Sequence, residues 1–225
     1  MTRADRYDAA IVGASLSGCT AAILLGRAGA RVALIEKSPD PEAFKRVCSH
    51  FIQASAVPTI ERLGLYEPIL DAGGLRSRFH SWTRWGWIEP TEERQAYCLN
   101  LRRELLDPML REAAAAQPGV ELMLGQSAAR LLRDGETFGG VGVRDPEGNE
   151  KEIRARLVIG ADGRDSGVAA MAAVKEQILP QTASPTAPTS KGRGRGSGPT
   201  APSGFSTPTW PPPSPPTAGS SSTSR

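Results

Sequence analysis

Apolar positions at the start of the chain form two short runs separated by a helical stretch. Residues 7–12 (YDAAIV) and 31–36 (RVALIE) have the length and apolar content of parallel strands buried on both faces. Between them, residues 16–28 carry apolar and small side chains at helical spacing, and Gly29 follows as a C-cap. A strand, a helix and a strand within about 30 residues predict one right-handed parallel crossover.

Beyond this crossover the pattern predicts further helices and strands. We interpret residues 37–54 as a loop and residues 56–63 as a short helix. Residues 75–100 are rich in Trp, Phe, Tyr and Thr, which favours antiparallel strands. Residues 103–116 have a helical apolar stripe, in which Pro108 predicts a kink or a late start.

The next segment alternates short apolar runs with turn residues. Residues 145–149 (DPEGN) predict a hairpin turn, and a helix is expected to start at Asp165 or Ser166. The predicted strands are residues 120–124, 128–133, 141–144, 150–156 and 157–160. The sequence therefore predicts an α/β fold with a Rossmann-like βαβ unit, a parallel sheet and an antiparallel β hairpin.

The last part of the chain has a different composition. Residues 181–225 contain 10 of the 19 prolines, no Asp or Glu, and no Val, Ile, Leu or Met. Such a segment buries too little apolar surface to offset its ordering entropy, so a disordered tail is expected. We place the domain boundary after residue 176, with residues 177–225 as a low-complexity tail.

Charge and cysteine content restrict the class of protein. The net charge of +3 comes from four basic residues of the tail, which leave residues 1–180 at −1, so no nucleic-acid-binding face is indicated. Three scattered cysteines without a CxxC pair indicate free thiols. With neither a signal peptide nor a membrane-spanning run, a cytoplasmic location is expected. The sequence does not predict an oligomeric state.

A glycine-rich turn after the first strand carries the first chemical signal. Residues 13–18 (GASLSG) follow the GxGxxG pattern, with serine at its middle glycine. Such a turn points backbone N–H groups and the positive end of a helix at a pyrophosphate. Glu36, at the end of the second strand, is placed to accept hydrogen bonds from ribose hydroxyls. The candidate dinucleotide-binding residues are Gly13, Ala14, Ser15, Leu16, Ser17, Gly18, Glu36 and Lys37.

A second motif, at residues 154–166 (RARLVIGADGRDS), indicates which dinucleotide cofactor is bound. A strand that leads into Asp162 and Gly163 resembles the DG fingerprint of aromatic-hydroxylase-like flavoprotein monooxygenases. The resemblance covers about residues 6–173. It implies FAD as cofactor, NAD(P)H as electron donor and Asp162-Gly163 beside the cofactor pyrophosphates.

Two further segments agree with this resemblance. Residues 100–110 (NLRRELLDPML) resemble the family segment in which an arginine opens a helix beside FAD, here Arg103 with Arg102 as the alternate. The loop at residues 45–53 takes the place where the family brings an arginine or a small loop to the flavin, which implies Arg46. This stretch looks most like the geranylgeranyl-reductase-like subgroup of the family. Cys48 and His50 are interpreted as packing or loop residues, since the flavin supplies the reactive centre.

Other chemical signals favour simpler explanations. Residues 85–90 (WGWIEP) differ from the halogenase Trp-x-Trp-x-Ile-Pro signature, so we interpret the tryptophans as lining a pocket or core. Two histidines and three cysteines, all scattered, predict no metal site, and no catalytic residue is assigned.

The family pattern ends shortly after residue 173. The family's second flavin-binding segment, a Gly-Asp followed by Ala and a Pro-rich turn, is absent from the sequence, so the FAD-binding domain is expected to be incomplete. Thr, Ala, Ser and Pro codons share a middle C, so a run of these residues is what a GC-rich coding sequence often yields when it is read in a shifted frame. We therefore hypothesise a frameshifted or truncated product. A natural disordered tail is the alternative.

The resemblance implies an NAD(P)H-dependent flavin monooxygenase that hydroxylates a small organic substrate. Two alternatives stay open: a flavin-dependent reductase of isoprenoid double bonds, and a non-catalytic FAD-binding fragment.

Overall fold

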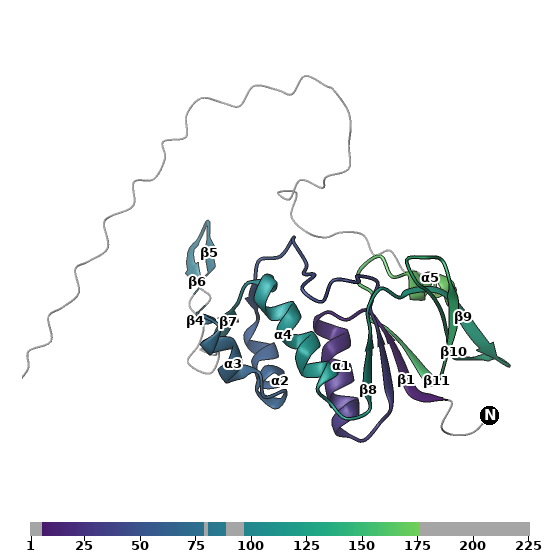
Figure 1. Cartoon of the computed structure of the whole chain (residues 1–225). Coiled ribbons are helices and arrows are strands. Elements are labelled where there is room, and N and C mark those ends of the chain that lie inside the picture. Colours follow the sequence, from purple (N-terminus) through teal and green to yellow (C-terminus); the bar gives the residue numbers. More distant parts are fainter. Residues whose placement is uncertain (1–5, 79–80, 89–96, 176–225) are drawn as a thin grey trace, which may run out of the picture. The chain divides into compact units, whose positions relative to one another are not determined.

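The computed structural model describes residues 6–78, 81–88 and 97–175 (Figure 1). Residues 1–177 form one compact unit, and residues 178–225, assigned to a second unit, lie outside the described part. The helices are α1 (Leu16–Arg27), the 3-10 helix η2 (Ala54–Ala56), α2 (Val57–Arg62), α3 (Tyr66–Asp71), α4 (Arg103–Ala115) and α5 (Gly167–Met171). The strands are β1 (Tyr7–Val12), β2 (Val32–Ile35), β3 (Phe51–Ile52), β4 (Leu75–Ser77), β5 (Ser81–Thr83), β6 (Gly86–Ile88), β7 (Cys98–Asn100), β8 (Val120–Met123), β9 (Ser127–Asp134), β10 (Thr137–Arg144) and β11 (Glu150–Gly160).

The main sheet has six strands in the order β8-β2-β1-β11-β10-β9. The pairs among β8, β2, β1 and β11 are parallel, and β9, β10 and β11 form an antiparallel meander. All four residues of β2 are buried, as expected for a parallel strand covered on both faces. The predicted α/β fold, with its βαβ unit, parallel sheet and antiparallel hairpin, is confirmed.

Strand β11 joins the parallel and antiparallel parts of this sheet. Its first half pairs antiparallel with β10 up to Arg154, and its second half pairs parallel with β1 from Ala155 onward. The prediction of two separate strands, residues 150–156 and 157–160, is therefore wrong. Residues 154–157 (RARL) contain no turn-forming residue, so the backbone of β11 stays extended while its partner changes from β10 to β1.

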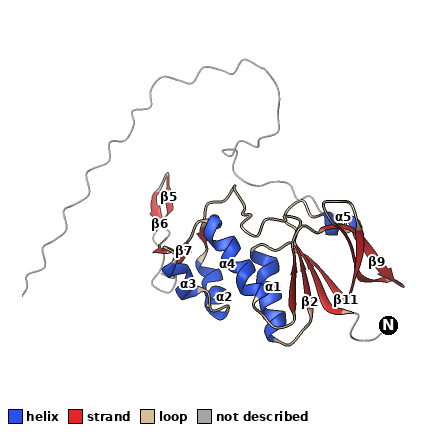
Figure 2. Ribbon diagram, viewed as in Figure 1, coloured by secondary structure: helices blue, strands red, loops and turns tan. Residues whose placement is uncertain are grey.

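Each face of the parallel strands has its own apolar core. Helices α1 and α4 lie side by side (Figures 1 and 2), and their buried residues, such as Ile23 and Leu110, join the core with Ile11 and Leu34. The opposite core combines alternate residues of β1 and β2 with residues of the meander. Its buried members are Ala10, Val12, Ala33, Ile35, Val141, Val143, Ile153, Ala155 and Val168.

Helix α4 begins at Arg103 and continues past Pro108, so the late start that the proline suggested does not occur. Its buried side includes Leu106 and Leu110, which belong to the helical stripe of the sequence. Tertiary packing of this stripe therefore outweighs the loss of one backbone hydrogen bond at the proline.

Residues 37–100 depart most from the prediction. The expected loop at residues 37–54 contains β3, which pairs with β7, and α3 was not predicted. The antiparallel pairs β4–β7 and β5–β6 agree with the strands expected in residues 75–100. Trp85 is 80% exposed, which contradicts a place in a core, because it lies in the turn between β5 and β6 and not on a strand. Residues 89 and 90 of the same motif lie outside the described residues.

Within the described part of the chain, each helix is too short or too polar to cross a lipid bilayer.

Candidate functional site

The turn between β1 and α1 lies at the carboxyl end of the parallel strands. Gly13 has φ +103°, a conformation that favours glycine, and its N–H donates to Ile35 O at 2.7 Å. A Cβ on Gly13 would lie 2.5 Å from Ala161 O, and a Cβ on Gly18 would overlap the Gly13 carbonyl oxygen. Gly13 is therefore required for the close packing of its turn against the turn at Ala161, and Gly18 for the close packing of α1 against the end of β1.

The first amides of α1 have no acceptor within the described residues. The first helical backbone bond runs from Cys19 N–H to Ser15 O at 2.9 Å, and no bond is recorded from the N–H groups of residues 15–18. Ser17 is exposed, so solvent reaches this end of the helix. Unpaired N–H groups at the positive end of a twelve-residue helix form a site for an anion such as a pyrophosphate.

Ser15 replaces the middle glycine of the motif without backbone strain. It is the N-cap of α1 with φ −112°, and its side chain makes no capping hydrogen bond. Its Oγ instead accepts a hydrogen bond from Arg103 Nη2 at 2.8 Å. The serine therefore connects the glycine-rich turn to α4, which lies 88 residues later in the chain.

Glu36 follows β2 at the same edge of the sheet. Its Oε2 accepts from Ala14 N–H at 2.9 Å, and its Oε1 accepts from Ser38 N–H at 3.0 Å. A carboxylate offers about four acceptor positions, so two hydrogen bonds leave capacity for ribose hydroxyls. The two backbone bonds fix the carboxylate beside the turn, in the place that the motif predicts.

The Asp162-Gly163 turn packs directly against the glycine-rich turn. Ala161 N–H donates to Val12 O at 2.8 Å, which extends the β1–β11 pairing to the start of this turn. Asp162 Oδ1 accepts from Ser166 Oγ at 2.6 Å, and Oδ2 accepts from Val168 N–H at 3.0 Å. Burial raises the Asp162 pKa, but these hydrogen bonds outweigh it and hold the pKa below its usual value. The Asp162 side chain thus fixes the turn to the start of α5.

Gly163 is exposed with φ +99°, and a Cβ there would meet nothing within 4 Å. The structure therefore brings residues 13–18, Glu36 and residues 161–163 together at one edge of the sheet.

Arg103 is the arginine of the pair that reaches the turn. It is 4% exposed, and its Nε and Nη2 each donate to the Asp107 carboxylate at 2.9 Å. Arg102 instead makes a surface ion pair with Glu104 at 3.4 Å. The favoured candidate, Arg103, lies near Ser15, and the alternate does not.

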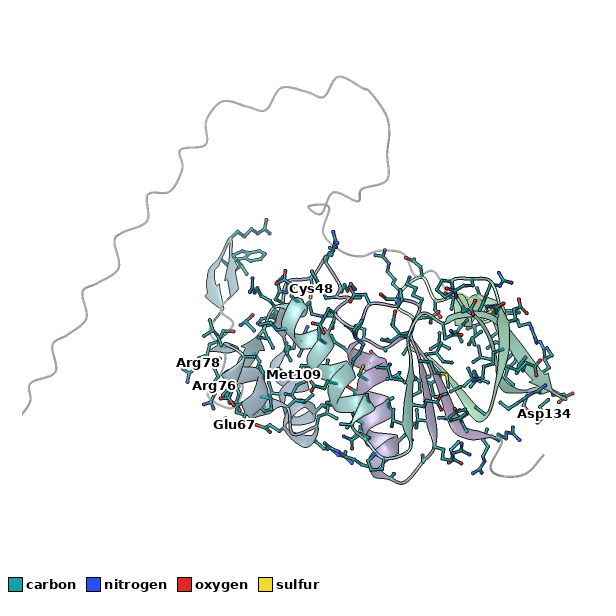
Figure 3. The ribbon with its side chains drawn as sticks, in the orientation of Figure 1. Cys48, Glu67, Arg76, Arg78, Met109 and Asp134 are labelled. Atoms are coloured by element: carbon teal, nitrogen blue, oxygen red, sulfur yellow. The ribbon has the colours of Figure 1, made fainter. Side chains whose placement is uncertain are left out.

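Loop residues surround the Arg103 guanidinium and backbone. Nη1 of Arg103 donates to Cys48 Sγ at 3.7 Å, and Arg103 N–H donates to His50 Nδ1 at 3.1 Å. Burial raises the Cys48 pKa, but hydrogen bonds from His50 N–H and Arg103 lower it below its ordinary value overall. Cys48 lies beside the upper end of α4 (Figure 3). Cys48 and His50 therefore both hydrogen-bond to Arg103, and their interpretation as packing or loop residues stays a prediction.

Lys37 and Arg46 are both exposed, and within the described residues neither has a recorded hydrogen bond or ion pair. The structure does not bring either side chain into the network around Arg103, so their assignment to the cofactor stays a prediction.

Sequence reasoning missed two buried charged residues, Asp107 and Arg111. The Arg111 guanidinium donates to Pro41 O at 2.9 Å, to Ala14 O at 3.3 Å and to Ala43 O. The signal was available as charged residues spaced by four along α4, which places them on one helix face.

Other features of the described residues lie away from this site. Within that part of the chain, no group of three or more His, Cys, Asp or Glu side chains could hold a metal ion. A cavity of about 410 Å³ is lined by residues of β8 and the β10–β11 hairpin, and none of the motif residues lines it.

Comparison with known proteins agrees with this geometry. Residues 6–186 match the family model described as FAD binding domain. Digeranylgeranylglycerophospholipid reductase of Methanocaldococcus jannaschii is 29% identical over 178 residues, which are 78% of this chain and 43% of the reductase. Kynurenine 3-monooxygenase of Salinispora arenicola is 32% identical over 70% of this chain and 36% of that protein. The chain thus spans less than half the length of these relatives.

Among solved structures, the OxyS anhydrotetracycline hydroxylase from Streptomyces rimosus superposes with a TM-score of 0.62 at 27% identity, over 74% of this chain and 33% of OxyS. The family model covers all of the described residues, including every motif at the carboxyl edge of the sheet. The chain therefore belongs to the FAD binding domain family.

Proposed function

We propose that this chain is the FAD-binding part, residues 1–176, of an NAD(P)H-dependent flavin monooxygenase that acts on a small organic substrate. The observation that carries the proposal is the start of α1, where the amides of residues 15–18 are unpaired within the described structure and follow the Gly13 turn, which packs against Ala161. Glu36 accepts from Ala14 N–H of this turn, and Arg103 donates to Ser15 Oγ.

The residues present fit the adenosine and pyrophosphate end of FAD. The amides of residues 15–18 would donate to pyrophosphate oxygens, and the Arg103 guanidinium would lie beside them. Glu36 would accept from the ribose hydroxyls through its remaining acceptor positions. Gly13 and Gly18 keep the turn free of side chains, which lets the phosphates approach the backbone.

Bound FAD supplies the redox chemistry of such enzymes, and the protein's part is to bind, orient and exclude water. The residues at this edge bind and orient the cofactor, and none of them is assigned to proton transfer or to contact with a substrate.

A reductase of isoprenoid double bonds is the second candidate, favoured by the 29% identity to the archaeal reductase. The two reactions differ in their use of oxygen. A monooxygenase couples NAD(P)H oxidation to oxygen consumption, whereas a reductase acts without an oxygen step. An oxygen electrode trace recorded during NAD(P)H oxidation therefore separates them.

The test of the binding proposal is the visible absorption spectrum of the purified full chain, followed by release and quantification of flavin. A yellow protein that binds added FAD supports the proposal. Glu36→Gln should weaken FAD binding, while Glu42→Gln, at an exposed position of the neighbouring loop, should leave it unchanged. Folded wild-type protein that is colourless and does not bind added FAD would reject the proposal.

A further inference from the structure

Helix α4 carries three buried charged side chains on one face. Arg103, Asp107 and Arg111 are 4%, 1% and 5% exposed, and they are the buried charged side chains among the residues that the structure describes. Their spacing of four places them in one row along the helix. Buried charges are costly unless they are paired and hydrogen-bonded, so this row needs an explanation beyond helix formation.

Asp107 lies at the centre of the row and makes three charge-assisted hydrogen bonds. Its carboxylate accepts from Nε and Nη2 of Arg103, each at 2.9 Å, and from Lys45 N–H at 3.0 Å. The two-pronged contact with Arg103 leaves the guanidinium little rotational freedom. The bond to Lys45 ties the loop that precedes Cys48 to the same carboxylate.

The orientation that Asp107 imposes on Arg103 directs Nη2 toward the glycine-rich turn, where it donates to Ser15 Oγ at 2.8 Å. Asp107 itself makes no recorded contact with residues 13–18 in the described structure. Asp107 therefore acts on a ligand at this turn through Arg103, through the loop at Lys45, or through the Coulomb field of its own charge, which already reaches Cys19 in α1.

The row also leaves positive charge beside the turn. Two guanidinium groups and one carboxylate give a net charge of +1 for the three side chains. Arg111 is compensated by the carbonyl oxygens of Ala14, Pro41 and Ala43, which are dipoles and not opposite charges. The Glu36 carboxylate, which accepts from Ala14 N–H of the same turn, brings the total for these four side chains to zero. An anion is therefore favoured here by the unpaired amides and by the placement of the guanidinium groups, and not by an excess of positive charge.

We infer that Asp107 is a positioning residue of the cofactor site, which sets the affinity for the pyrophosphate of FAD by fixing Arg103 against Ser15. The inference rests on the proposed function, because it requires the pyrophosphate at the β1–α1 turn. Asp107 does not contact the cofactor in this arrangement; it acts through the Arg103 guanidinium.

The test is a double-mutant cycle on the full chain, with dissociation constants of FAD and ADP measured by calorimetry. Asp107→Asn keeps the side-chain size but removes a negative charge, which by itself would strengthen the binding of an anion. A loss of about tenfold or more for both ligands therefore reports the lost positioning of Arg103. Ser15→Ala should weaken them through the same guanidinium, so the double variant should be no weaker than the poorer single variant. Glu112→Gln, an exposed acid of the same helix, is the matched control and should bind as wild type does.

Two outcomes overturn the inference: wild-type affinity in a folded Asp107→Asn variant, or full additivity of the two substitutions. If Asp107 had a purely structural role, the two substitutions would be additive, because a general loss of stability caused by Asp107→Asn would be the same with or without the Ser15 hydroxyl. If Asp107→Asn does not fold, Arg103→Lys gives the answer, since lysine keeps the charge and loses the two-pronged contact. A tenfold loss there supports the inference, and unchanged affinity rejects it.

Failure of the proposed function gives a different result. In that case folded wild-type chain binds neither FAD nor ADP, whereas failure of the positioning role leaves wild-type binding intact.

Discussion

Replacing Gly13 by alanine tests whether the two motif turns are packed as tightly as the structure indicates. A Cβ at this position would lie 2.5 Å from Ala161 O, 2.8 Å from Ala161 C and 3.1 Å from Asp162 Cα. All three are backbone atoms, so no side-chain rotation relieves the overlap. The residue also has φ +103°, which an L side chain rarely adopts.

The expected loss of stability has two parts. Backbone strain at such a φ costs about 1–3 kcal/mol, and overpacking adds about 1–3 kcal/mol. Gly29→Ala isolates the first part, since Gly29 has φ +80° and a Cβ there would meet nothing within 4 Å. The difference between the variants should be about 1–3 kcal/mol, or roughly 2–12 °C in Tm for a domain of this size.

Both free energies of unfolding are to be measured by chemical denaturation, with FAD affinity as a second readout. Movement of the Gly13 turn should also weaken FAD binding, whereas Gly29→Ala should not, because Gly29 lies at the opposite end of α1. Equal stability losses in the two variants would show that the turns are not in close contact, and the reasoning would fail.

Two pH-dependent predictions follow from the lowered pKa values of Cys48 and Asp162. The pKa of Cys48 is lowered, so its thiol should react with iodoacetamide at a lower pH than an ordinary thiol does, and Arg103→Leu should raise the pH of half-maximal alkylation. Alkylation is measured by mass spectrometry. Cys19, whose pKa burial raises to about 12, is the unreactive control in the same spectra. Asp162 has a pKa below its unfolded value, so its contribution to stability is present above about pH 4 and is lost as the pH falls through the folded pKa. Denaturation curves at pH 6 and pH 3 should therefore differ less for Asp162→Asn than for wild type, and an unchanged difference would contradict this role.

The elements predicted best from the sequence are those whose stability is local or whose burial is complete. Strand β1 has the predicted bounds, and α1 and β2 differ from the prediction by one residue at some ends, because short apolar runs next to the glycine turns at Gly13 and Gly29 permit few alternatives. Strand β3 and helix α3 were missed for the opposite reason. Two residues of β3 have no period to detect, and they are extended only because β7 pairs with them from about 50 residues later.

The site shows the same division. Gly13, Gly18 and Glu36 were predictable because one turn and two strand ends place them, and motif spacing records those constraints. Asp107 and Arg111 depend on carbonyls and amides of the loop at residues 41–45, which no pattern in α4 reveals. The charged row was visible in the sequence, but its burial was not, since charged residues on a helix are usually solvated.

The buried row on α4 indicates how the binding edge and the fold depend on each other. Replacing buried ion pairs by apolar side chains is often neutral or stabilising, so folding alone does not require Arg103 and Asp107. Apolar residues at these positions would, however, leave Ser15 without its donor and the loop at Lys45 without its acceptor. The amides of residues 15–18 are likewise unpaired within the described structure, which costs free energy unless water or an anion binds them. A diphosphate group at this edge would offset the cost of the unpaired amides, because its oxygens would accept from them, and it would lie beside the guanidinium that Asp107 orients.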